Sequence, residues 1–196
     1  YEIGLGIPAE PLFRSSSTGQ ITSLVNKMLT LANENTKDLL KEVEETDALD
    51  ICRKALRGMP PVDAKHVKVE LEDHTDGRGT ILCTNSDSLL QMLGNILENS
   101  AMCTEKGFIR LTLRNDGETM WFTVEDTGCG IPEDKVSTIF ERFVKVDKFK
   151  HGLGLGLAYC HETAERLGGI LRLDYTSEAG TSFTLGLPLK VKNVNN

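Results

Sequence analysis

Residues 126–132 read DTGCGIP and come directly after a predicted strand at residues 120–125. Gly128 and Gly130 let the backbone approach a flat ring, and the carboxylate of Asp126 can accept a hydrogen bond from the exocyclic amine of adenine. The stretch also resembles half of a calcium-binding loop, but the acidic ligands that would complete an EF-hand are absent at the required spacing. Taken alone, it leaves an adenine-binding loop and a strand-ending turn open.

A second glycine-rich stretch lies downstream, where residues 152–157 read GLGLGL and lead into a predicted helix at residues 155–167. Alternating glycines expose amide N–H groups, and the N-terminus of the following helix carries a partial positive charge that suits phosphates. The preceding residues 144–151 read VKVDKFKH, which predicts a basic lid over a polyphosphate, with a solvated surface loop as the alternative. The stretch is neither a Rossmann fingerprint nor a Walker A loop.

Two asparagines, Asn95 and Asn99, lie four residues apart on a predicted helix that ends near Met102. Positions i and i+4 share one face of a helix, so both amides project to the same side. Mg²⁺ prefers hard oxygen ligands such as amide oxygens while it bridges phosphates, whereas the alternative is that the two amides cap neighbouring loops. Near the end of the chain, Gly180 permits a turn, and Thr181 can hydrogen-bond to a phosphate or to the adenine side of a pocket.

The surrounding sequence alternates between strand-like and helix-like segments. Turns are predicted at Asp76-Gly77 and at Asn115-Asp116-Gly117, each between two strands. Apolar residues spaced by three and four predict further helices at residues 18–33 and 47–56. The predicted strands cover residues 67–71, 80–84, 108–114, 120–125, 170–175 and 182–188. The sequence therefore predicts a mixed α/β domain that is preceded by a helical segment.

The order and spacing of these motifs resemble the catalytic ATP-binding domain of sensor histidine kinases, within the superfamily of gyrase, Hsp90 and MutL ATPases. The resemblance covers about residues 62–189. The matching segments are Asn95–Asn99 for the N box, residues 126–132 for the G1 box, residues 139–143 (IFERF) for the F box, residues 152–157 for the G2 box and Gly180-Thr181 for the last glycine motif. The resemblance implies a two-layer α/β sandwich of the Bergerat type, with a mixed sheet and three helices on one face.

The same resemblance implies ATP and Mg²⁺ as ligands and gives individual residues a role. Asn99 is expected to ligate Mg²⁺, Asp126 to hydrogen-bond to adenine and Lys145 to bind the phosphates. The implied ATP-binding residues are Asn95, Asn99, Asp126, Gly128, Gly130, Ile131, Phe143, Lys145, Gly152, Leu153, Gly154, Leu155, Gly156 and Thr181. Asn95 and Lys145 are the expected catalytic residues. Asn95 stands where hydrolytic relatives have a glutamate that activates water, and because an amide is no general base, transfer to another acceptor is favoured over hydrolysis.

The helix at residues 18–33 resembles the end of the dimerisation and phosphoacceptor hairpin of such kinases, which forms a four-helix bundle in a dimer. The predicted organisation is a helical remnant at residues 1–60, an ATP-binding domain at residues 61–190 and a tail at residues 191–196. No histidine is followed by glutamate and proline as in the hairpin; the four histidines are His66, His74, His151 and His161. The expected partners are therefore ATP, a histidine-bearing hairpin of the full-length protein, a response regulator receiver domain and a second copy in a homodimer.

Two other functions stay open. A serine kinase of the anti-sigma-factor type has the same ATP site without the hairpin, and the helix at residues 18–33 disfavours it. A degenerate nucleotide-binding regulatory module is the other alternative. It is favoured by three departures from the family pattern. Met102 and Cys103 stand where the family often has a basic and an aromatic residue, and Val144 stands where an aromatic residue is common in the lid.

Composition narrows the class of protein further. The 196 residues include 22 lysines and arginines against 29 acidic residues, and the resulting net charge of −7 argues against a nucleic-acid partner. No apolar run of transmembrane length and no signal segment occurs in the sequence. The five cysteines form no C-x-x-C pair and are odd in number, which is typical of reduced thiols in the cytoplasm.

Overall fold

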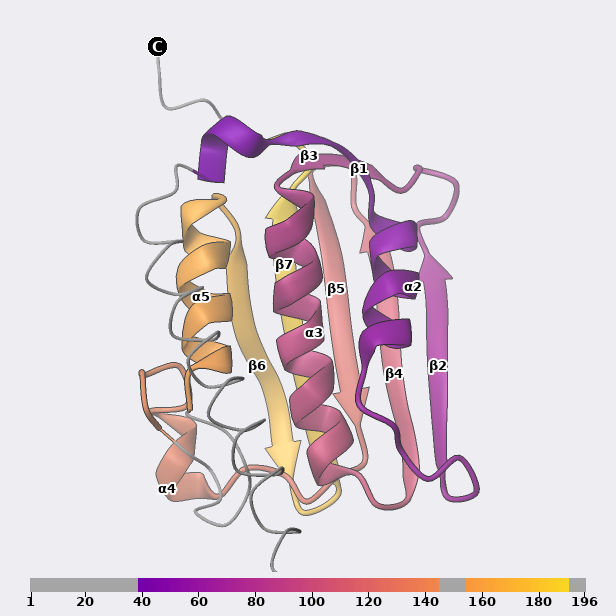
Figure 1. The fold of residues 1–196 in the computed structure, drawn as a ribbon, viewed down its shortest axis with the longest axis vertical. Coiled ribbons are helices and arrows are strands. Elements are labelled where there is room, and N and C mark those ends of the chain that lie inside the picture. The colour runs from indigo at the N-terminus through magenta and orange to yellow at the C-terminus, as the bar shows by residue number, and fades with distance from the viewer. Residues whose placement is uncertain (1–38, 145–153, 191–196) are drawn as a thin grey trace, which may run out of the picture. The chain divides into compact units, whose positions relative to one another are not determined.

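The computed structural model describes residues 39–144 and 154–190, which form one layer of strands and one layer of helices (Figure 1). The five-stranded sheet has the order β2-β4-β5-β7-β6, in which β2 runs parallel to β4 and the other pairs are antiparallel. The strands are β2 (Val67–His74), β4 (Gly107–Asn115), β5 (Thr119–Asp126), β6 (Ile170–Ser177) and β7 (Gly180–Pro188). Three helices, α2 (Ala48–Gly58), α3 (Ser86–Cys103) and α5 (Gly156–Arg166), cover one face (Figure 1). The predicted two-layer fold with a mixed sheet is confirmed.

The core lies between the helical layer and the sheet. Successive side chains of a strand point to opposite faces, and along β5 the buried ones are Met120, Phe122, Val124 and Asp126. The helix α3 presents a matching apolar stripe of buried residues, which are Leu89, Met92, Leu93, Ile96 and Leu97. Removal of these side chains from water stabilises the packing of α3 on the sheet. The same packing fixes the position of Asn95 and Asn99 relative to Asp126 at the end of β5.

The opposite face of the sheet is polar. Arg110 on β4 forms ion pairs with Glu70, at 2.9 Å, and with Glu125, at 3.5 Å. The indole of Trp121 lies against Gly186 of the neighbouring strand, where a Cβ would come within 2.5 Å of the ring. Exposed ion pairs contribute little to stability, so packing on the helical face and the hydrogen bonds between the strands hold the sheet.

The predicted hairpin between β4 and β5 is confirmed, and the carboxylate of Asp116 holds its turn. Oδ1 of Asp116 accepts hydrogen bonds from the backbone N–H groups of Glu118, at 3.0 Å, and Thr119, at 2.8 Å. Oδ2 accepts a third hydrogen bond from the indole N–H of Trp121, at 2.6 Å. These donors, the indole first, lower the pKa of Asp116 from 3.8 to about 2.

Replacing Asp116 with alanine is expected to lower the free energy of unfolding at pH 7 by about 1 kcal/mol, the net value of a hydrogen bond. Because the pKa of Asp116 is lower in the folded chain than in the unfolded chain, its contribution is present above about pH 4 and lost as the pH falls towards about 2. Urea unfolding of wild type and variant at several pH values measures this. A stability difference that stays constant down to pH 2 would contradict the role of the ionised carboxylate.

The short strands at the start of the domain differ from the prediction. β1 (Glu44–Asp47) was not predicted, and it pairs antiparallel with β3 (Ile81–Thr84) in a separate two-stranded sheet. Asp76 and Gly77 do form a turn, with positive φ angles of 50° and 75°. This turn lies between two strands, as predicted, but the two strands have different partners, because β2 pairs with β4 whereas β3 pairs with β1.

Residues 39–60 pack within the same unit as the sheet. The chain divides into one unit at residues 1–37 and a second at residues 38–196. The buried face of α2 consists of Ala48, Ile51, Cys52 and Ala55, and this helix packs against α3 and the β2–β4 side of the sheet. The helix α2 therefore packs with the sheet, while the predicted domain boundary at residue 61 stays a prediction. The helix predicted at residues 18–33 and the tail at residues 191–196 lie outside the described residues.

Candidate nucleotide-binding site

A buried carboxylate, that of Asp126, lies at the end of β5 with 4% of its surface exposed. Its Oδ2 accepts a hydrogen bond of 2.7 Å from the hydroxyl of Ser100, and its Oδ1 accepts one of 2.9 Å from the backbone N–H of Gly128. Burial raises the pKa of Asp126, while Ser100, Gly128 and the backbone of Thr181 oppose that rise. A carboxylate has about four acceptor positions, so these donors leave capacity for one from a ligand.

The loop after β5 is held in place by the hairpin that β6 and β7 form. The backbone N–H of Ile131 donates a hydrogen bond of 2.8 Å to the hydroxyl of Thr176, which lies 3.4 Å from the hydroxyl of Thr181. Gly130 has a φ of 70°, and a Cβ there would collide with the carbonyl of Ser177. The two predicted glycines and Ile131 are thus brought next to Asp126 and Thr181. Ser100 and Thr176 were not predicted as parts of the site.

The two predicted asparagines lie half-buried on α3, on the side that faces α5. The side chain of Asn95 is 3.6 Å from the position that a Cβ would take at Gly156, the first residue of α5. Asn95 also hydrogen-bonds to the thiol of Cys160, whose pKa burial raises to about 12, so that the thiol stays neutral. Asn99 lies one helical turn further along, next to Ser100. The structure therefore brings Asn95 next to the start of α5, while Asn99 precedes Ser100, whose hydroxyl bonds to Asp126.

The N-terminus of α5 has no side-chain cap, in contrast to the other long helices. Asp47 caps α2 and Asn85 caps α3, whereas Leu155 precedes α5 and makes no such hydrogen bond. The first N–H groups of a helix lack partners within it and favour an anion. Gly154, with a φ of 67°, accepts a hydrogen bond of 2.8 Å from the backbone N–H of Phe143. The described part of the G2 stretch therefore leads directly to the first backbone N–H groups of α5, which have no side-chain cap.

Known proteins match this part of the chain. Residues 84–191 match the family described as histidine kinase-, DNA gyrase B- and HSP90-like ATPase. The chain belongs to this family. The match begins at the last residue of β3 and ends just after β7, so it contains the N box, the two glycine-rich loops and Thr181.

Several curated relatives of this ATPase-family chain are sensor proteins. The sensor protein TorS of Escherichia coli is 43% identical over 101 residues, which are 52% of this chain and 11% of TorS. The alginate biosynthesis sensor protein KinB of Pseudomonas aeruginosa is 30% identical over 172 residues, or 87% of this chain and 29% of KinB. The sensor histidine kinase WalK of Bacillus subtilis is 28% identical over 182 residues, or 89% of this chain and 30% of WalK. The chain thus spans less than a third of the length of these relatives.

Solved structures of histidine kinases share the fold. Full-length ShkA, crystallised in complex with AMPPNP, has a TM-score of 0.76 and 28% identity, covering 88% of this chain and 36% of ShkA. The mycobacterial sensor histidine kinase MprB has a TM-score of 0.63 and 25% identity, covering 74% of this chain and 97% of that structure. The recognition of the histidine kinase type of ATPase domain from its motifs is confirmed.

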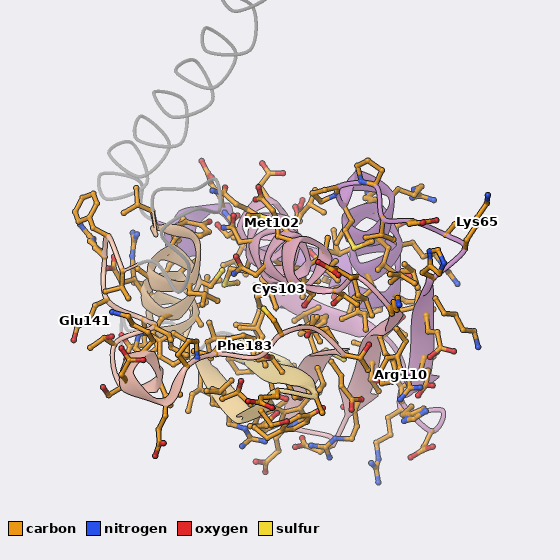
Figure 2. All side chains as sticks on the ribbon, turned by 90° about the horizontal axis from the view of Figure 1, so that it is seen from below. Lys65, Met102, Cys103, Arg110, Glu141 and Phe183 are labelled. Atoms are coloured by element: carbon orange, nitrogen blue, oxygen red, sulfur yellow. The ribbon has the colours of Figure 1, made fainter. Side chains whose placement is uncertain are left out.

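Three predicted residues, Lys145, Gly152 and Leu153, lie outside the described residues, as does the predicted lid apart from Val144. Phe143, also predicted, is 65% exposed and has a φ of 68°. Its backbone N–H donates a hydrogen bond to the carbonyl of Gly154, which connects the F box to the start of α5. Figure 2 shows Met102 and Cys103 at the end of α3, where both are half-buried. The structure therefore groups the predicted residues around Asp126 and around the start of α5 and leaves Phe143 towards solvent.

The donors at the site suit magnesium better than a transition metal. Residues 39–144 and 154–190 contain no group of three or more histidine, cysteine or acidic side chains that could hold a metal ion. The amide oxygen of Asn99 is a single hard ligand, which fits an ion that keeps several waters and takes its other ligands from phosphates. The site thus fits Mg²⁺ that arrives with a nucleotide.

Replacing Gly130 with alanine is expected to destabilise the fold by about 1–2 kcal/mol for its left-handed backbone, with a further loss from the collision with Ser177. Gly77→Ala is a matched control, because Gly77 has a φ of 75° but no atom near the position of its Cβ. Urea unfolding of both variants separates the destabilisation that comes from the backbone conformation from the destabilisation that comes from the collision. Equal losses for Gly77→Ala and Gly130→Ala would show that the contact between the loop and β6 is unimportant.

Proposed function

We propose that this chain is the ATP-binding kinase domain of a two-component sensor histidine kinase. In this proposal it transfers the γ-phosphate of ATP to a histidine on a dimerisation hairpin, for onward transfer to the receiver domain of a response regulator. The observation that carries the proposal is the pairing of a buried acceptor, Asp126, with the uncapped start of α5 on either side of the two α3 asparagines. Such a site suits a ligand with an amine-bearing base at one end and phosphates at the other.

The two ends of the proposed site bind different parts of ATP. Asp126 accepts a hydrogen bond from the adenine amine, and the neighbouring Gly128 and Gly130 let the loop pack closely against Cys103 and Ser177, which keeps the carboxylate in place. At the other end, the first backbone N–H groups of α5 bind the phosphates, together with the backbone of Gly154, Leu155 and Gly156. The side chain of Lys145 adds a positive charge there. Mg²⁺ bound through Asn99 would neutralise charge that develops on the phosphate oxygens.

Asn95 lies against α5 at the phosphate end but cannot take a proton from water as a carboxylate does. Hydrolysis is therefore slow in this proposal, and the phosphoryl group is kept for an acceptor that the partner supplies. Positioning of that acceptor and electrostatic stabilisation provide most of the catalysis in phosphoryl transfer. The matched relatives are sensor kinases, which favours this function over a serine kinase or a degenerate regulatory module.

The proposal includes the hairpin of the full-length protein, a second copy in a homodimer and a cytoplasmic location for this domain. The location is supported by the five cysteines, none of which forms a disulfide in the structure. Among the described residues we find no helix with the length and apolar character that a membrane crossing requires.

Titration calorimetry with ATP tests the proposal. Wild type is expected to bind ATP more tightly with Mg²⁺ than with EDTA, whereas Asn99→Ala is expected to lose about tenfold or more of the affinity gained from Mg²⁺. In EDTA, wild type and variant are expected to bind alike, because the metal contact is then absent from both. ATP binding that does not respond to Mg²⁺, or to the loss of Asn99, would contradict this assignment.

A further inference from the structure

Ser100 is the side chain that contacts the acceptor of the proposed site most directly. It is 2% exposed, and its hydroxyl donates a 2.7 Å hydrogen bond to Oδ2 of Asp126. The other carboxylate oxygen is held from the opposite side by the backbone N–H of Gly128. Two donors from different elements, α3 and the loop after β5, therefore fix the plane of one buried carboxylate.

Among the residues that the structure describes, neutral donors and no cation stabilise the charge of Asp126. The groups that lower its pKa are all neutral: the hydroxyl of Ser100 first, then the backbone N–H groups of Gly128 and Thr181. Burial raises its pKa, and so does the negative charge of Glu125, the preceding residue on β5. The hydroxyl of Tyr175 on β6 hydrogen-bonds to Glu125 at 3.1 Å, on the face of the sheet opposite to Asp126.

The protonation state of Asp126 decides which base it can accept. An ionised carboxylate only accepts hydrogen bonds, so it pairs with the 6-amino group of adenine and repels the 6-oxo group of guanine. A protonated carboxyl carries an O–H donor, which suits the oxo group of guanine and loses part of its value for adenine. Whatever keeps Asp126 an acceptor therefore also provides selectivity between the two bases.

We propose that Ser100 is a positioning residue which, through its hydrogen bond to Asp126, holds that carboxylate as an acceptor and so sets the selectivity of the site for adenine over guanine nucleotides. This inference rests on the proposed function, since it requires that the site binds ATP. In this inference Ser100 acts through Asp126 and does not contact the nucleotide. The effect is carried by one hydroxyl group, which can be removed without a change in charge.

The test compares Ser100→Ala with wild type in calorimetric titrations of ATP and of GTP, each with Mg²⁺, between pH 5.5 and pH 8. Removal of the donor raises the pH at which Asp126 takes up a proton. The loss of ATP affinity on acidification is therefore expected about one pH unit higher in the variant. Below that pH, the affinity for ATP is expected to fall about tenfold for each further unit of acidification. The ratio of ATP affinity to GTP affinity is expected to fall in parallel.

Ser88→Ala is the matched control, because Ser88 is also a buried serine of α3 but lies in the first turn, where its backbone N–H bonds to Asn85. This variant is expected to keep the wild-type pH profile and selectivity. Thermal unfolding checks that Ser100→Ala is folded. If it is not, Ser100→Cys, of similar size and with a weak donor, replaces it in the same titrations.

A pH profile and an ATP-to-GTP ratio that coincide with those of wild type would overturn this inference and leave the proposed function standing. A loss of ATP affinity that is the same at every pH and equal for GTP would assign Ser100 to packing alone, which also overturns the inference. No affinity of wild type for ATP at any pH would overturn the proposed function, and this inference with it.

Discussion

Asp126→Asn is expected to weaken the binding of ATP by about tenfold to a hundredfold. The substitution keeps the size of the side chain but replaces a charged acceptor with a neutral one that also carries donors. A hydrogen bond to a charged group contributes about 1.5–3 kcal/mol, and about 1.4 kcal/mol corresponds to a factor of ten in affinity. Titration calorimetry with ATP and Mg²⁺ at pH 8 measures the loss.

Glu125→Gln is the matched control for this experiment. Glu125 precedes Asp126 on β5, so its side chain points to the opposite, polar face of the sheet, where it pairs with Arg110. The control is expected to bind ATP as wild type does, while GTP is expected to bind poorly to both proteins. Unchanged ATP affinity in Asp126→Asn would remove Asp126 from the base-binding role.

The features that could be predicted from the sequence are those with a local pattern. The strand that leads to Asp126 and the apolar stripe of the helix that carries Asn95 and Asn99 were both predicted. The turn at Asn115–Gly117 needed only its own residues and the strands on either side. In each of these segments, neighbours within a few residues determine the structure.

The elements that were missed depend on partners far away in the sequence. β1 reads EETD, which has no apolar alternation, and it becomes a strand because it pairs with β3 some forty residues later. β2 lies parallel to β4, a pairing that was not predicted, and a parallel pair needs a long crossover, which here contains β3 and α3. Neither pairing leaves a signal within the strands themselves.

Ser100 and Thr176 were missed for a different reason. Both carry a small hydroxyl that is common at the end of a helix or within a strand, and their role depends on which buried groups they meet in the fold. Ser100 directly follows Asn99 on the buried side of α3, and that position next to the N box was the one local signal that could have indicated it. Thr176 has no such neighbour, because it reaches Ile131 only through the β6–β7 hairpin.

The isolated chain is expected to bind ATP without labelling itself. Transfer requires an acceptor nitrogen in line with the γ-phosphate, and a positioned acceptor gains many orders of magnitude in rate over one that is not. Adding a hairpin that carries a phosphoacceptor histidine is therefore expected to raise labelling on the order of a hundredfold or more. The measurement is incubation with γ-labelled ATP, followed by acid and base treatment, because phosphohistidine is acid-labile and base-stable.

The described histidines lie in positions that oppose self-labelling. His66 and His74 belong to the β2 side, and β2 is the edge of the sheet opposite to β6, with α2 and α3 between it and α5 (Figure 1). The ring of His66 is also bonded to Asp63 at 2.8 Å. His161 lies on α5, but its ring stacks on Phe140 with 5.0 Å between centroids, which holds it in the packing against the F box. His151 lies outside the described residues.

His161→Gln and His151→Gln separate the possible outcomes. If the isolated chain acquires strong acid-labile label, and one of these variants abolishes it, the acceptor is on this chain and the proposed transfer to a separate hairpin is wrong. Rapid release of phosphate with no label would instead show that water reaches the γ-phosphate without a carboxylate in the place of Asn95. Slow turnover without label, followed by label on the added hairpin, is the result expected from an amide at that position, since it leaves water unactivated until a better acceptor is brought into line.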